Sequence, residues 1–138
     1  MKKIYLAIPY TEIKDKSFRI ANRVAGLLIE MGYVVFSPIS HSHSIWSECK
    51  DLLENDFETW MAQDEPFLQW ADELYVIDIK SNSLDSDGLG LIYRSKGVKR
   101  EIEIAKELKK PIILIQYDED SDRLTIFDKN TKSNERTQ

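Results

Sequence analysis

Short apolar runs alternate along the chain with longer segments in which apolar residues recur at every third or fourth position. Runs of strand length lie at Ile4–Ile8, Tyr33–Phe36, Glu73–Ile79 and Lys110–Tyr117, with a candidate edge strand at Arg123–Asp128. The runs are nearly continuous, as in strands that are buried on both faces. Because helical segments separate them, the pattern predicts an α/β fold. We expect a single-domain Rossmann- or flavodoxin-like sheet, mostly parallel, with about five strands and helices on both faces.

Glycine and proline mark the limits of these elements. Gly32 is expected to end the first helix, and Pro38 is expected to end the second strand, with a polar loop of sequence SHSHSIW after it. Pro66 is tolerated in the first turn of a helix but not in its middle. We therefore expect a break in the helical segment before it, with a new helix that starts near Asp64.

Length and composition predict one domain with a short tail. The 138 residues are 42% hydrophobic and 31% charged, which fits one globular domain with a sizeable core. Residues 129–138 contain no apolar residue and are expected to be a disordered tail, so the domain is placed at residues 1–128. Ser81 to Tyr93, between the third strand and the next helix, is either a lid over a site or a disordered insertion.

Charge and motif content exclude several classes of function. A net charge of -5 argues against a nucleic-acid polymer as partner, because binding a phosphate backbone requires a basic face. The single cysteine, Cys49, suits a reducing compartment, and no apolar run is long enough to span a membrane, so we expect a cytoplasmic protein. No glycine-rich dinucleotide fingerprint or Walker loop is present, and two histidines make a weak zinc motif. No cofactor and no metal are therefore expected.

One glutamate has an unusual place in the segment SKGVKREIEIA, Ser95 to Ala105. At about 100° per residue, Glu101 falls within the apolar stripe of Val98 and Ile104, whereas Glu103 falls on the charged side. Burial of a carboxylate is unfavourable unless the group is paired, hydrogen-bonded or needed for function. The segment follows the third strand, and ligands of parallel sheets bind beyond the carboxyl ends of strands. Glu101 is therefore a candidate site residue.

Four segments, KIYLAIPY, GYVVFSPISHSH, QDEPFLQWADELYVIDI and SKGVKREIEIAKELKKPI, extend from Lys3 to about Ile115. Together they resemble the nucleoside 2-deoxyribosyltransferase superfamily, which includes transferases and nucleoside 5′-monophosphate N-glycosidases. The VFSPISHSH segment is similar to an uncharacterised branch of that superfamily. The resemblance implies a Rossmann-like fold, a small-molecule nucleotide or nucleoside as partner, and a homodimer or higher homo-oligomer.

The resemblance also implies that Glu101 is a nucleophile, because Gly97 and Glu101 match the Gly-x-x-x-Glu pattern at the start of the family's active helix. A carboxylate suits attack on an anomeric carbon that becomes oxocarbenium-like as the base departs. From the residues alone, a structural alternative stays open. In that alternative, Glu101 is buried and paired to Arg19 or Arg100, or bonded to backbone amides.

Ser95 stands where the transferases usually carry an aspartate and the monophosphate glycosidases carry a serine. A serine hydroxyl and the backbone N–H groups at a helix start form an anion site that would favour a 5′-phosphate. Lys96 and Lys99 add positive charge. The alternative is that Ser95 only caps the helix.

Other candidates lie at the remaining strand ends. Asp64 matches an acidic residue that handles the leaving base in the family, although Asp-Glu-Pro is also a good helix start. Tyr10 matches a residue that lies against the sugar, next to Ile8, which replaces a glycine of the family pattern. Each of these residues has packing or solvation as its alternative. Further candidate substrate contacts are Arg19, His41, His43 and Asp78.

These observations predict an N-glycosidase that hydrolyses the N-glycosidic bond of a nucleoside or deoxynucleoside 5′-monophosphate through Glu101. The main reason for hydrolysis is Ser95. One alternative is a nucleoside 2-deoxyribosyltransferase, and another is cleavage of a nicotinamide–ribose bond. A non-catalytic module that binds or senses a nucleotide belongs to a different class and is also consistent with the sequence.

Overall fold

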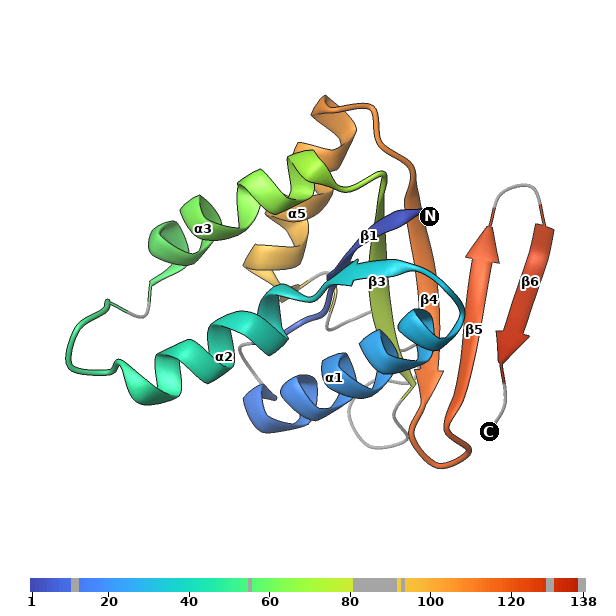
Figure 1. Ribbon diagram of the computed structural model, residues 1–138, viewed down its shortest axis with the longest axis horizontal. Coiled ribbons are helices and arrows are strands. Elements are labelled where there is room, and N and C mark those ends of the chain that lie inside the picture. Colours follow the sequence, from blue (N-terminus) through green and yellow to red (C-terminus); the bar gives the residue numbers. More distant parts are fainter. Residues whose placement is uncertain (11–12, 55, 81–91, 93, 129–130, 137–138) are drawn as a thin grey trace.

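The computed structural model describes residues 1–10, 13–54, 56–80, 92, 94–128 and 131–136. Within this part, six strands form one sheet in the order β2-β1-β3-β4-β5-β6 (Figure 1). The parallel strands are β1 (Lys3–Ala7), β2 (Val34–Phe36), β3 (Glu73–Lys80) and β4 (Ile112–Asp118). β5 (Arg123–Asp128) and β6 (Thr131–Arg136) complete the sheet as antiparallel strands. The mostly parallel α/β sheet that the apolar runs predict is thus confirmed.

Helices cover both faces of this sheet. One face carries α1 (Lys14–Glu30), and the other carries α3 (Phe57–Trp70) and α5 (Lys96–Glu107), while α2 (Pro38–Glu48) follows β2 and contacts α1 and β1 (Figure 1). Side chains alternate along β1: Ile4 and Leu6 pack toward α1, and Tyr5 and Ala7 pack toward α3 and α5. Both sets are fully buried, which explains why the strand sequence is apolar without interruption.

The segment expected to be a polar loop is the helix α2. The Ser37 side chain accepts a hydrogen bond from the backbone N–H of Ser40 at 3.4 Å, and Pro38 occupies the first turn. Proline suits that position, because the N–H that it lacks has no partner in the first turn of a helix. Pro38 therefore ends β2 and begins α2, and the prediction of a loop at SHSHSIW is wrong.

α3 is continuous and begins at Phe57, so the prediction of a helix start near Asp64 is also wrong. Asp56 caps it, with its carboxylate accepting a hydrogen bond from the Thr59 N–H at 2.7 Å. Pro66 lies inside the helix, where a proline removes one backbone hydrogen bond. Packing of α3 against the sheet, through the fully buried Leu68, outweighs this local preference.

Residues 129–138, which were expected to be disordered, include the strand β6, which pairs with β5. An edge strand presents unpaired backbone N–H and C=O groups, and a polar segment can bond to them without any apolar side chain. Except for the buried Ile92, the possible lid or insertion at Ser81 to Tyr93 lies outside the described residues. In the described part of the chain, no helix is long and apolar enough to cross a membrane.

We expect a truncated protein that ends at Asp128 to keep the fold. Residues 129–138 contain no apolar side chain, and Leu124 and Ile126 of β5 belong to the core on the α1 face. Removal of the tail should therefore lower the thermal unfolding temperature by less than about 4 °C, or about 1 kcal/mol. Calorimetry of both proteins checks this, and loss of cooperative unfolding would show that β6 is required.

Candidate active site

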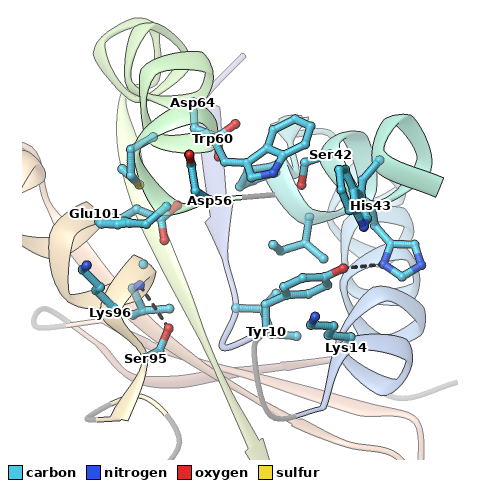
Figure 2. Close-up of a pocket in the computed structure, with 18 residues that line it drawn as sticks. Tyr10, Lys14, Ser42, His43, Asp56, Trp60, Asp64, Ser95, Lys96 and Glu101 are labelled. Atoms are coloured by element: carbon cyan, nitrogen blue, oxygen red, sulfur yellow. Dashed lines mark hydrogen bonds between the residues drawn. The ribbon is translucent and has the colours of Figure 1, made fainter. Parts of the chain in front are cut away.

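A cavity of about 270 Å³ lies beyond the carboxyl end of β1, between the start of α5 and the helices α2 and α3 (Figure 2). This is the edge at which open α/β sheets bind ligands. The charged residues that line it are Lys14, Asp56, Asp64, Lys96 and Glu101, and much of the remaining wall consists of Ile8, Ile39, Trp46, Trp60 and Met61. An apolar cavity with a few charged groups is typical of a site for a small organic ligand.

Glu101 faces the interior, as the helical periodicity predicts. Its side chain is buried at the cavity, and the Tyr5 hydroxyl of β1 donates a hydrogen bond to its Oε2 atom. Glu103 lies on the outer face, 63% exposed, and pairs with Arg100 at 3.2 Å. The expected alternative, an ion pair between Glu101 and Arg100 or Arg19, is not formed: Arg100 binds Glu103, and Arg19 is exposed outside the cavity lining.

The environment of Glu101 favours its neutral form. The pKa of Glu101 is raised to about 8, chiefly by burial; the hydrogen bond from Tyr5 lowers it, and the charge of the nearby Asp64 raises it. The pKa of Tyr5 is itself raised well above its usual value, by burial first and then by the two acidic groups. Tyr5 therefore stays protonated and can donate to Glu101 throughout the neutral range.

Asp64 is the second buried carboxyl group of the cavity. It lies in the interior of α3, so the alternative that it caps a helix is wrong, and that role belongs to Asp56. Its Oδ1 atom has no hydrogen-bond partner among the described residues, and burial raises the pKa of Asp64 to about 7. Two neighbouring carboxyl groups with raised pKa values can hold one proton between them near neutral pH, which equips the cavity for proton transfer.

The start of α5 forms another part of the wall. The Ser95 side chain accepts a hydrogen bond from the Val98 N–H at 3.2 Å and is the N-cap of the helix. A Cβ atom added at Gly97 would meet no atom within 4 Å, so protein packing does not require the glycine. The Lys96 ammonium lies over the Phe57 ring, 4.5 Å from its centroid. Ser95 thus has the capping role, and the open space beside Gly97 leaves the helix start accessible to a ligand.

Tyr10 and His43 lie together on the other side of the cavity (Figure 2). The Tyr10 hydroxyl is hydrogen-bonded to Nδ1 of His43 at 2.7 Å. His43 also stacks on Phe18 of α1, with ring centroids 4.2 Å apart. Six of the nine residues that the sequence singled out therefore line one cavity: Tyr10, His43, Asp64, Ser95, Gly97 and Glu101.

Three candidates lie outside the cavity lining. His41 and His43 are two positions apart in α2, and helical geometry turns such neighbours to nearly opposite sides. His41 is exposed beside Phe36 and Phe67, and Arg19 is exposed on α1. Asp78 is buried in β3, where the Gln116 side chain donates a hydrogen bond to it at 3.4 Å.

Sequence reasoning did not identify Tyr5, Lys14, Asp56 or Trp60 as site residues. Asp56, the N-cap of α3, and Trp60 and Asp64 within it are spaced four residues apart, and all three line the cavity. The four-residue spacing was not recognised in the sequence, because a helix break was expected before Pro66. Among the described residues, no group of three or more His, Cys, Asp and Glu side chains could hold a metal ion.

A family model described as "Domain of unknown function (DUF1937)" matches residues 2–117. None of the curated proteins matches the chain. Among solved structures, the chain is similar to a 2-deoxyribosyltransferase from the psychrotolerant bacterium Bacillus psychrosaccharolyticus, with 24% identity and a TM-score of 0.53 over 83% of this chain and 72% of that one. It is also similar to a 2-deoxyribosyltransferase from Leishmania mexicana, with 18% identity and a TM-score of 0.52 over 86% of this chain and 66% of that one. The expected likeness to this superfamily is confirmed at the level of the fold.

The two buried carboxyl groups predict an unusual dependence of stability on pH. The pKa of Glu101 rises on folding from 4.5 to about 8, and that of Asp64 from 3.8 to about 7, so the folded state binds more protons than the unfolded state between these limits. The free energy of unfolding should therefore fall as pH rises from about 5 to 8. Urea unfolding of Glu101→Gln should show a smaller fall. Glu103→Gln, on the exposed face of α5, should keep the slope of the unaltered protein, and equal slopes in all three would contradict the burial of a carboxyl group.

Proposed function

The chain belongs to the DUF1937 family, and we propose that it is an N-glycosidase that hydrolyses a nucleoside or deoxynucleoside 5′-monophosphate. The observation that carries the proposal is the burial of two carboxyl groups with raised pKa values, Glu101 and Asp64, in one cavity. Such pairs are typical of sites for acid–base and nucleophilic catalysis. The fold shared with two 2-deoxyribosyltransferases supports chemistry at an N-glycosidic bond.

In the proposed mechanism, the Glu101 carboxylate attacks the anomeric carbon while protonated Asp64 donates its proton to the departing base. The bond from carbon to base breaks, and an ester between Glu101 and the sugar forms. Asp64 then takes a proton from water, which attacks the anomeric carbon and releases Glu101 as a carboxylate. The products are a free base and a pentose 5-phosphate.

The proposed reaction requires that Glu101 is negatively charged and that Asp64 is protonated when the substrate binds. Without substrate, the pKa is about 8 for Glu101 and about 7 for Asp64, so Glu101 is the more readily protonated of the two. Two interactions favour the required arrangement: Tyr5 donates a hydrogen bond to Glu101, and the positive charge that develops at the anomeric carbon lies against the attacking carboxylate. Once the bound substrate has lowered the pKa of Glu101 below that of Asp64, Asp64 holds the proton that the base requires, and its Oδ1 atom, which has no partner among the described residues, is available to the base.

The start of α5 supports a phosphate on the substrate. Ser95 and Gly97 line the cavity together with Lys96, so hydroxyl, backbone N–H and ammonium donors are available at the positive end of the helix dipole. The capping bond of Ser95 uses its oxygen as an acceptor and leaves its hydroxyl proton to donate. A phosphate dianion accepts from all of these donors.

The second candidate is a 2-deoxyribosyltransferase, favoured by the activity in the names of the two similar structures. It differs only in the group that attacks the sugar ester, which is a second base instead of water. To distinguish hydrolysis from transfer, the protein is incubated with one deoxynucleotide or deoxynucleoside and a different free base, and the products are analysed by chromatography. Hydrolysis yields free base and sugar alone, and transfer yields the exchanged product.

We expect Glu101→Gln to abolish base release, with a loss of more than about a thousandfold in kcat, because the amide keeps the shape but is not a nucleophile. Binding of the nucleotide should change little. Glu103→Gln is the matched control, since its side chain lies on the opposite face of the same helix. Chromatography of the released base measures the activity of both variants. Near-normal activity of Glu101→Gln would remove Glu101 from the mechanism.

Ser95→Asp should change the choice of substrate while it preserves the helix start, because aspartate is also a good N-cap. The new carboxylate loses the donated hydrogen bond and repels a phosphate. We expect kcat/KM for a monophosphate to fall by about tenfold to a hundredfold, and kcat/KM for the matching nucleoside to fall much less. If the ratio of the two values is the same in both proteins, Ser95 serves only as a cap.

A further inference from the structure

The Tyr10 side chain makes two contacts with His43, a hydrogen bond and a contact between the rings. Its hydroxyl is hydrogen-bonded to Nδ1 of His43 at 2.7 Å, and the two rings meet edge to face, with centroids 5.8 Å apart and an interplanar angle of 85°. His43 is itself held by stacking on Phe18, at 4.2 Å and 20°. Tyr10, just beyond β1, is thereby connected to α2 directly and to α1 through Phe18.

The backbone around Tyr10 is fixed as well. The carbonyl oxygen of Tyr10 accepts a hydrogen bond from the Ile13 N–H at 3.1 Å, and the Ser17 hydroxyl donates to the carbonyl of Pro9. Backbone and side chain are thus both restrained before any ligand binds. Because the hydroxyl is engaged by His43, the part of Tyr10 that remains for a ligand is the ring.

The position of this ring in the cavity indicates which part of a substrate it meets. Figure 2 shows Tyr10 across the cavity from Ser95, Lys96 and Glu101, and Trp60 at the end of the cavity near Asp64. Trp60 lies one helical turn before Asp64 in α3, so the two side chains share a face. In the proposed mechanism the base departs toward Asp64, which places a flat, aromatic group between these two aromatic residues.

We propose that His43 is a positioning residue that holds Tyr10 as a rigid platform on which the nucleobase of the substrate stacks. This inference rests on the proposed function. Stacking on aromatic side chains contributes to the binding of any base, because every base has a π-face. A ring that is already immobilised loses little conformational entropy on binding, so the hydrogen bond between Tyr10 and His43 increases affinity without contact between His43 and the substrate.

Kinetics of paired variants test the positioning role. His43→Leu keeps an apolar contact with Phe18 but removes the bond to Tyr10, and Tyr10→Phe keeps the ring but removes the hydroxyl. Each should raise KM by about fivefold to tenfold with kcat nearly unchanged, and the double variant should be no worse than either single one. His43→Asn, whose amide can bond to the Tyr10 hydroxyl, should restore part of the lost affinity. A fall in kcat at constant KM, or additive effects in the double variant, would refute the positioning role.

His41→Leu is the matched control for the histidine substitution. His41 lies in the same helix but is exposed beside Phe36 and Phe67, outside the cavity lining. It should leave KM unchanged. An increase in KM as large as that of His43→Leu would mean that the effect comes from α2 as a whole and would overturn the assignment to His43.

Calorimetry with half-ligands tests the platform without any need for turnover. The probes are the free bases adenine, hypoxanthine, cytosine and thymine, and the sugar phosphates ribose 5-phosphate and 2-deoxyribose 5-phosphate. Tyr10→Phe and His43→Leu should weaken binding of the tightest base by about fivefold to tenfold and leave sugar phosphate binding unchanged. The platform is refuted if no base binds the unaltered protein or if both kinds of ligand weaken equally. If bases bind as expected but no nucleotide is cleaved, the proposed hydrolysis fails and the platform stands.

Discussion

The removal of two carboxyl groups from water into one small space is the constraint on which this site depends. Burial disfavours the charged form of both Glu101 and Asp64, and the charge of Asp64 makes ionisation of Glu101 still less favourable. The protein supplies only limited compensation, a hydrogen bond from Tyr5 to Glu101. The arrangement is stable because three separate elements, β1, α3 and α5, hold these side chains in a core that is otherwise apolar. In the proposed mechanism, the charge of the Glu101 carboxylate is neutralised when it forms an ester with the sugar, which removes the cost of its burial.

One face of the sheet packs only into the apolar core, and the other also contributes to the candidate site. On the face covered by α1, the side chains of β1, β3 and β4 are packed into an apolar layer. On the face covered by α3 and α5, β1 contributes Tyr5, and the helices contribute Asp64 and Glu101. Because successive side chains of a strand point to opposite faces, one residue of β1 reaches the hydrogen-bonded site and the next packs in the apolar core. The parallel register then brings the carboxyl ends of the strands to a common edge, where the cavity lies.

The sequence predicts those features that depend on periodicity within one element. The inward position of Glu101 follows from the apolar stripe of α5, and the parallel sheet follows from apolar runs separated by helices. Features that depend on a neighbouring element were missed. In β1, a tyrosine between two aliphatic residues is equally typical of an apolar core, so the sequence does not mark Tyr5 as the partner of Glu101. Pro38 ends a strand and also starts a helix, which the side chain of Ser37 caps.

The sheet ends on each side in a strand that offers little to another chain. β2 has only three residues, and β6 comes from a segment with no apolar residue. An exposed, long and hydrophobic edge would let copies of the protein add strand to strand and grow into aggregates. Here the short edge provides few backbone groups, and the polar edge provides no apolar surface to bury. Open-ended sheet growth is therefore disfavoured at both ends, which favours a protein that remains dispersed at high concentration.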